Sequence, residues 1–245
     1  ESVNEDMPGE MAVGGSHIAL FHKFPYISID LQDVILYSDK SKSEEKEVIH
    51  LEDLYIGFSL LDIVKGNYDV KAIELDRGHI DLTQYEDGSY DITKILGIDT
   101  TEESDEKSEM IHFALKKIDL DHVDVHLILP HKQLKYTFAF EHIHSKFRSK
   151  KDLMDIYLDT KFYGTILKNG KLTAMNKKLF ELDTDLQYLT DINKIIVEPT
   201  QFIFEHISLD VEGFMELEGE KNIDLKLEGK KENFNLLIAF APAEL

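Results

Sequence analysis

Residues 25–33 read PYISIDLQD, and this stretch carries the pattern that recurs along the chain. Ile27, Ile29 and Leu31 alternate with polar residues, so a β-strand would place the three apolar side chains on one face and the polar ones on the other. Such alternation is typical of a strand with one buried face. It returns further along at Ile73 and Leu75, at Ile80 and Leu82, at Val123, Val125, Leu127 and Leu129, at Ile156 and Leu158, at Ile203, Ile207, Leu209 and Val211, and at Ile223, Leu225 and Leu227.

The segments between these strands carry residues that tolerate a positive φ. They are found at Asp76-Arg77-Gly78, at Asp87-Gly88, at Lys168-Asn169-Gly170 and at Glu218-Gly219. Hairpins and meanders are the expected result. The sequence therefore predicts an all-β fold with one or two short helices, built either as an elongated, antiparallel, curved sheet or as stacked β-groove repeats.

Helical spacing is confined to two short segments. In residues 59–65, Leu60, Leu61 and Val64 fall on one helical face, and Gly66-Asn67 provides a stop signal. Residues 178–190 are the second candidate helix.

Three stretches resemble one another, which suggests internal duplication. Residues 27–36 (ISIDLQDVIL) and 118–127 (IDLDHVDVHL) share their alternation and a central acidic residue, and residues 204–212 (FEHISLDVE) echo them. A stacked β repeat, in which each unit covers the exposed edge of the next, has such spacing. The alternative is that amphipathic strands look alike without being repeats.

We expect the chain to consist of three parts. Residues 1–23 form a polar leader that we expect to be poorly ordered, residues 24–110 form a first β unit, and residues 111–245 form a second unit that continues beyond this fragment. The polar start and the apolar run at residues 236–241 suggest a piece of a longer protein. The side chains expected to point to an apolar interior are Ile27, Ile29, Leu31, Val123, Val125, Leu127, Leu225 and Leu227.

Charge and composition exclude several classes of function. The chain has 48 acidic and 27 basic residues, a formal net charge of −21, which repels nucleic-acid phosphates and anionic membrane surfaces. We therefore expect no nucleic-acid partner. The chain has no cysteine, so it has neither a disulfide framework nor a thiolate nucleophile. No apolar run approaches the roughly 20 residues of a membrane span, and no basic-then-apolar signal peptide begins the sequence.

Residues 24–96 contain FPYISIDLQDVIL and then HLEDLYIGFSLLDIVKGNYDVKAIELDRGHIDLTQYEDGSYDITKIL. This segment resembles the AsmA-like family of bacterial envelope proteins, in the form found in Bacteroidetes-type bacteria. The family's F-P-x-I-S, L-L-x-G, I-x-L-x-x-G-x-I and D-G-x-x-N elements correspond to residues 24–28, 60–66, 73–80 and 87–91. Asp91 departs from the pattern, since the family often has asparagine there. Beyond residue 111 the match is looser and includes the strand NIDLKLEG at residues 222–229.

The resemblance implies a periplasmic protein, held to the inner membrane by a segment upstream of Glu1. It further implies a function in outer-membrane assembly or in moving phospholipid or another acyl lipid between membranes, without an enzymatic step and without a cofactor. The alternative is a periplasmic scaffold with a closed core that binds envelope proteins. A metal-binding protein or an enzyme is a more distant alternative, and a shared fold is by itself a weak argument for function.

The candidate lipid-binding residues are aromatic. Tyr136, Phe138 and Phe140 share one face of a strand, and Phe202 and Phe204 follow in another strand with apolar residues on both faces. Such strands either lie inside a core or line a groove that accepts an apolar ligand. We take these five residues as the candidate lining of an apolar groove, while core packing remains the alternative.

A weak metal candidate lies at His122, Asp124 and His126. Alternation along one strand would project these ligand types from one face, about 7 Å apart. Ligands on a flat strand diverge rather than converge on one point, which favours a polar strand face over a metal site. The sequence has no phosphate-binding G-x-x-x-x-G-K-[ST] motif and no G-x-S-x-G nucleophile elbow, so no catalytic residue is predicted.

Overall fold

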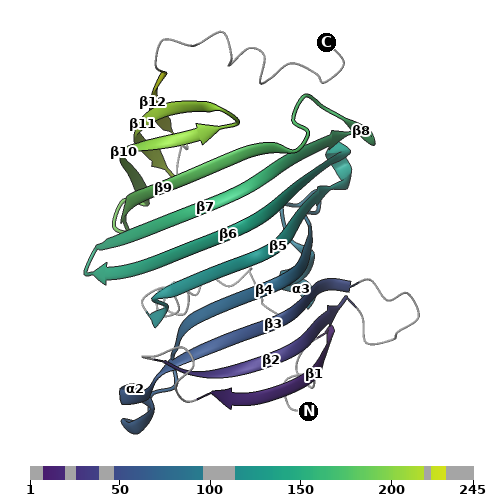
Figure 1. The fold of residues 1–245 in the computed structure, drawn as a ribbon, viewed down its shortest axis with the longest axis vertical. Coiled ribbons are helices and arrows are strands. Elements are labelled where there is room, and N and C mark those ends of the chain that lie inside the picture. Colours follow the sequence, from purple (N-terminus) through teal and green to yellow (C-terminus); the bar gives the residue numbers. More distant parts are fainter. Residues whose placement is uncertain (1–7, 20–25, 39–46, 96–113, 218–221, 230–245) are drawn as a thin grey trace.

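A computed structural model describes residues 8–19, 26–38, 47–95, 114–217 and 222–229. The strands form a single 12-stranded sheet in the order β1-β2-β3-β4-β5-β6-β7-β9-β10-β11-β12, with the short β8 paired to β7. Figure 1 shows the strands following one another along the long axis of the molecule, so the sheet is long and curved. The spacing between strands gives the sheet a length of about 50 Å.

The strands of the first half are β1 (Glu10–Ala19), β2 (Tyr26–Tyr37), β3 (Glu47–Ser59), β4 (Val70–Thr83), β5 (Lys117–Leu129) and β6 (Leu134–Lys150). Those of the second half are β7 (Leu153–Lys168), β8 (Lys171–Leu172), β9 (Lys178–Leu189), β10 (Lys194–Phe204), β11 (Ile207–Glu216) and β12 (Ile223–Gly229). The helical elements are α2 (Leu60–Val64), α3 (Asp91–Ile95) and the 3-10 turn η1 (Pro130–Lys132).

The predicted all-β, curved-sheet fold is confirmed, with two corrections. First, β4 and β5 pair in parallel, in a register that runs from Ala72↔Lys117 to Thr83↔Ile128, while the other described pairs are antiparallel. The sheet therefore continues across the expected boundary at residue 110. Second, part of the expected polar leader is strand β1, because its residues from Glu10 to Ala19 complete the edge of the sheet against β2.

Three strands contain a left-handed residue at matching positions. Asp33 in β2, Arg77 in β4 and His122 in β5 have φ values of 51°, 49° and 52°, and the pairing register places them side by side across the sheet, with Glu52 of β3 between the first two. We call this the kink line. Each kink reverses the alternation, so Leu31 and Val34, three residues apart, belong to the same apolar cluster.

The kink line corrects one predicted turn. Asp76-Arg77-Gly78 lies in the middle of β4 instead of ending a strand, because its two positive φ values bend the strand without breaking its pairing. The turns at Asp87-Gly88 and at Asn169-Gly170 are confirmed by positive φ at Gly88, Asn169 and Gly170. The turn expected at residues 218–219 lies outside the described residues.

One predicted helix is confirmed and the other is wrong. In α2, the Ser59 hydroxyl accepts a hydrogen bond from the Asp62 N–H, and Gly66 follows the last turn with φ of 83°. Residues 178–189 are instead strand β9, which pairs with β7 on one side and with β10 on the other. The segment also has apolar residues with the period of two that a strand requires, at Phe180, Leu182, Leu186 and Tyr188. Hydrogen bonding along both of its edges stabilises the strand over the helix.

The best-packed part of the molecule lies in the first half of the sheet. Val34, Leu51 and Val123 are 2%, 2% and 0% exposed. Of the residues expected in the interior, Val123 is buried, while Leu227 on the edge strand β12 is 55% exposed and the others are half-buried. The first two of the three similar stretches occupy matching places in one sheet, although the kinks align Asp33 with His122, two residues away from the expected alignment. The third, residues 204–212, spans the turn between β10 and β11 instead of lying within one strand.

Candidate apolar binding face

One face of the sheet carries a nearly unbroken series of apolar side chains, which we call the apolar face. Residues paired across neighbouring strands project from the same side of a sheet. One cross-strand row runs from β1 to β11 and consists of Val13, Val34, Leu51, Gly78, Val123, Phe140, Phe162, Phe180, Phe204 and Ile207. The neighbouring row from β2 to β11 consists of Leu31, Leu54, Leu75, Leu120, Ile143, Thr160, Leu182, Phe202 and Leu209.

The middle of this face is a chain of aromatic rings, which we call the aromatic ladder. It comprises Tyr136, Phe138, Phe140, Phe162, Phe180, Phe202 and Phe204. Tyr136 stacks on Phe138, with ring centroids 6.4 Å apart, and Phe140 lies 5.1 Å from Phe162. Phe162 stacks on Phe180 at 4.8 Å, and Phe180 lies 6.0 Å from Phe202 and 5.0 Å from Phe204. Four strands, β6, β7, β9 and β10, therefore contribute to one continuous aromatic surface.

The structure brings together all five aromatic residues predicted from the sequence. It adds Phe162 and Phe180, which the sequence analysis missed and which join the two predicted groups. Phe162 could have been found as an even-numbered member of the alternation in β7. Phe180 was hidden because its segment was predicted to be a helix.

The apolar face differs in burial along its length. Toward β1, α3 covers it: Ile95 is 5% exposed and packs in one cluster with Leu36 and Val48, and Ile92 and Met11 pack against that cluster. Along the aromatic ladder, Phe204 is buried, whereas the other six rings are only half-buried. Neither α2 nor η1 contributes a buried residue. The ladder is therefore apolar surface that the described part of the chain leaves partly open.

The metal candidates do not come together. The left-handed backbone at His122 interrupts the alternation, so His122 does not project with Asp124 as in a regular strand, and its ring pairs with Asp121. His126 Nδ1 lies 2.6 Å from Asp81 Oδ1 on β4. Within the described ranges, no group of three histidine, aspartate or glutamate side chains converges in a way that would hold a metal ion.

The opposite face of the sheet, which we call the polar face, is held by ion pairs. Lys117 Nζ lies 2.6 Å from Asp119 Oδ2 and donates a hydrogen bond of 3.0 Å to Glu74 Oε1. Burial by itself lowers the pKa of Lys117, but the hydrogen bonds to Asp119 and Glu74 outweigh it, so the pKa lies above its usual value. Lys161 likewise lies 3.0 Å from Glu141 and 3.6 Å from Glu181.

The raised pKa of Lys117 predicts a pH dependence of stability. A lysine with a higher pKa in the folded state stabilises fully below its unfolded pKa near 10.5, and that contribution is lost as pH rises through the folded pKa. Lys117→Met should therefore lower the free energy of unfolding by about 0.5–1 kcal/mol at about pH 8 and by less at about pH 11.5. Urea unfolding at both pH values measures the difference. The exposed Lys171→Met is the control, and an equal cost of Lys117→Met at both pH values would contradict the assignment.

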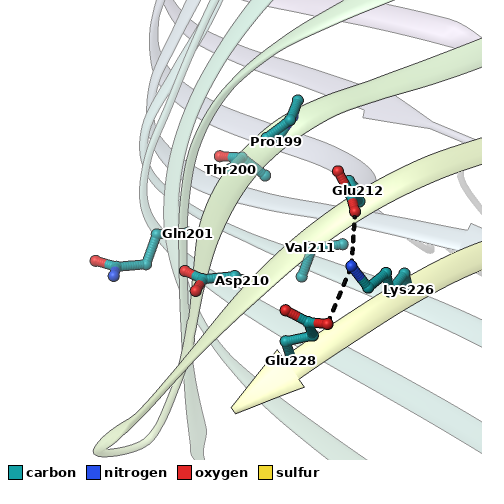
Figure 2. Close-up of a pocket in the computed structure, with 8 residues that line it drawn as sticks. All are labelled: Pro199, Thr200, Gln201, Asp210, Val211, Glu212, Lys226 and Glu228. Carbon is teal, nitrogen blue, oxygen red and sulfur yellow. Dashed lines mark hydrogen bonds and ion pairs between the residues drawn. The ribbon is translucent and has the colours of Figure 1, made fainter. Parts of the chain in front are cut away.

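A hollow of about 390 Å³ lies over β10, β11 and β12 (Figure 2). Lys226 Nζ sits within it, 3.1 Å from Glu212 Oε1 and 3.0 Å from Glu228 Oε1. It coincides with the irregular register of β10 between Val197 and Thr200. Gln201 and Asp210 border it, and in strand alternation they face away from Phe202 and Leu209. This charge-lined hollow is therefore separate from the aromatic ladder.

No model of a known protein family matches the chain, and a search of curated proteins returns no match either. Among the described residues, no helix has the length and apolarity that crossing a membrane requires.

Proposed function

We propose that the apolar face is an acyl-lipid-binding groove in a non-enzymatic, AsmA-like protein of the cell envelope. In this proposal the protein lies in the periplasm, is anchored to the inner membrane in its full-length form, and takes part in outer-membrane assembly or intermembrane lipid transport. The observation that carries the proposal is the aromatic ladder: seven connected rings on a continuous apolar face, six of them only half-buried.

The physical argument concerns apolar area left in water. Each partly buried aromatic ring leaves some apolar surface in water, and burying that surface is favourable by about 25 cal/mol per Å². An acyl chain that lies across β6, β7, β9 and β10 buries such area on several rings at once. From Phe140 the row runs across the strands through Phe162 and Phe180 to Phe204, so an extended chain can follow it without meeting a charged side chain of that row.

The charge distribution favours apolar contact over recognition of a head group. The chain carries a net charge of −21, and Lys117, Lys161 and Lys226 of the polar face are already paired with carboxylates. An anionic head group would meet repulsion from this net charge. Binding is therefore expected to be weakly selective among lipids and dominated by the acyl chain.

Displacement of a fluorescent fatty acid tests this proposal. Phe138→Asp places a carboxylate on the ladder, where it must either lose its water or keep water in the groove, and both oppose acyl binding. We expect the affinity to fall by about tenfold or more, in line with the cost of desolvating an unpaired charge. Native mass spectrometry of the parent chain should show co-purified lipid.

Thr137→Asp is the matched control, because Thr137 is adjacent in sequence but pairs with His126 and Thr165 on the polar face. It should bind the fatty acid like the parent, and thermal melting checks that both variants fold. A parent chain that binds no fatty acid, or equal affinities for the two variants, would argue against the groove.

The second candidate is a protein-binding scaffold, and the open sheet edges favour it. β1 and β12 end the sheet, and no further described strand pairs with either of them on its outer side. Such edges accept an added strand from a partner protein. A chain that binds no lipid in the assay above but captures envelope proteins through these edges would fit this candidate.

A further inference from the structure

The connection between β3 and β4 exposes large apolar side chains. Leu60, Leu61 and Val64 of α2 and the nearby Tyr68 are 45%, 71%, 79% and 68% exposed. We call these four residues the apolar tip; α2 lies at one corner of the molecule in Figure 1, at the strand ends. Single exposed apolar residues are ordinary, but four within nine residues form a patch.

The tip is held by backbone hydrogen bonds, so its side chains are presented on a defined support. The Asp62 carbonyl accepts bonds from the N–H groups of Lys65 and Asn67, at 3.0 and 2.8 Å. The Gly66 N–H donates to the Ile63 carbonyl at 2.9 Å. Together with the hydrogen bond to the Ser59 hydroxyl, these bonds pair backbone groups of the turn with one another, while the apolar side chains remain exposed to solvent.

Charge distinguishes this segment from the rest of the chain. Residues 59–71 contain two aspartates and two lysines, a formal charge of zero in a chain of −21. Both carboxylates face Lys71: its Nζ lies 3.6 Å from Asp62 and 3.2 Å from Asp69. The tip can therefore approach an uncharged surface without bringing unpaired carboxylates with it.

The apolar face reaches the strand ends next to the tip. The cross-strand row formed by Ile27, Phe58 and Val70 lies at the strand ends that α2 joins. The tip therefore extends from the end of the apolar face. A tyrosine beside aliphatic side chains suits the region between lipid tails and head groups, where an aromatic ring is partly buried and its hydroxyl stays hydrated.

We propose that the apolar tip inserts into the surface of a lipid bilayer rich in zwitterionic lipid. This contact places the strand ends of β3 and β4, and with them the end of the apolar face, at the membrane. It does not require that the aromatic ladder bind acyl chains.

Flotation of the whole chain with phosphatidylcholine vesicles tests the proposal. The parent should float with the vesicles, and Leu61→Ser/Val64→Ser should reduce the vesicle-bound to free ratio by about tenfold or more, since two apolar side chains no longer leave water. Leu172→Ser/Ile192→Ser is the matched control, because those residues are 59% and 56% exposed elsewhere in the molecule, in the short strand β8 and in the turn before β10. Replacing part of the phosphatidylcholine with phosphatidylglycerol should weaken binding at low salt, given the acidic chain.

Several results would overturn the proposal: a parent that stays with the soluble fraction, an equal loss in the control variant, or a parent dimer that Leu61→Ser/Val64→Ser dissociates. The last result would assign the tip to a second copy of the chain. The two proposals fail separately. Phe138→Asp should still float, and Leu61→Ser/Val64→Ser should still bind the fluorescent fatty acid in solution.

Discussion

Replacing Gly78 with alanine is expected to destabilise the protein by about 3–5 kcal/mol, among the largest effects of any single substitution in this chain. Gly78 has φ of 149°, a conformation that side chains with a Cβ rarely adopt. A Cβ at this position would lie 1.9 Å from the His50 carbonyl oxygen and 2.9 Å from the Leu51 Cα. Both atoms are backbone of the central strand β3, so neither can move aside without disturbing the pairing of β3 with β4.

Gly88→Ala separates backbone strain from the close approach. Gly88 also has a positive φ, 85°, but no atom lies within 4 Å of the position its Cβ would take. Gly88→Ala should therefore lower the free energy of unfolding only by the strain of the left-handed backbone, about 1 kcal/mol. Urea unfolding measures both variants. If the two variants unfold at the same urea concentration, β3 and β4 do not approach each other as closely at Gly78 as described.

The second large effect should fall on Leu51 and should be much larger than the effect on Phe162. Leu51 is 2% exposed and packs with Val34 and Val123, so Leu51→Ala leaves a cavity in closed packing and should cost about 2–5 kcal/mol. Phe162 lies in the same cross-strand row but is only partly buried, so part of its ring is already in contact with water. Phe162→Ala should cost only about 1–2 kcal/mol.

This comparison distinguishes an open groove from a filled core, which were the alternatives left by the sequence. Leu172→Ala, at a side chain that is 59% exposed, is the reference and should change the free energy of unfolding by no more than about 0.5 kcal/mol. A cost for Phe162→Ala as large as that for Leu51→Ala would mean that the aromatic ladder is closed. The scaffold hypothesis would then be preferred.

The candidate site was predicted in part. Tyr136, Phe138 and Phe140 belong to one strand, so alternation alone was enough to group them. Phe202 and Phe204 were recognised by the same argument in a distant strand. The link between the groups is Phe162 stacked on Phe180, which depends on the pairing of β7 with β9. The sequence between these strands includes β8 and does not indicate that pairing.

The kink line could not be predicted from the sequence. The residues at Asp33, Arg77 and His122 are ordinary strand or turn residues, and nothing in their types required a left-handed conformation within a strand. The turn predicted at Gly78 was wrong for this reason, and the left-handed backbone at His122 keeps that side chain from projecting with Asp124 as it would in a regular strand. A kink is tolerated there because neighbouring strands bend at the same level and keep their hydrogen-bonded register.

The sequence by itself determined that the chain is built of strands, that most strands have one apolar and one polar side, and that a short helix follows Ser59 and ends before Gly66. Alternation and capping are properties of residues a few positions apart, so they can be read locally. The tertiary structure alone decided the strand order, the parallel β4–β5 pair, the kink line and the joining of seven aromatic rings into one ladder. These features depend on which strands pair and in what register. That choice is set by the combined packing and hydrogen bonding of segments far apart in the chain, and no single strand contains the information.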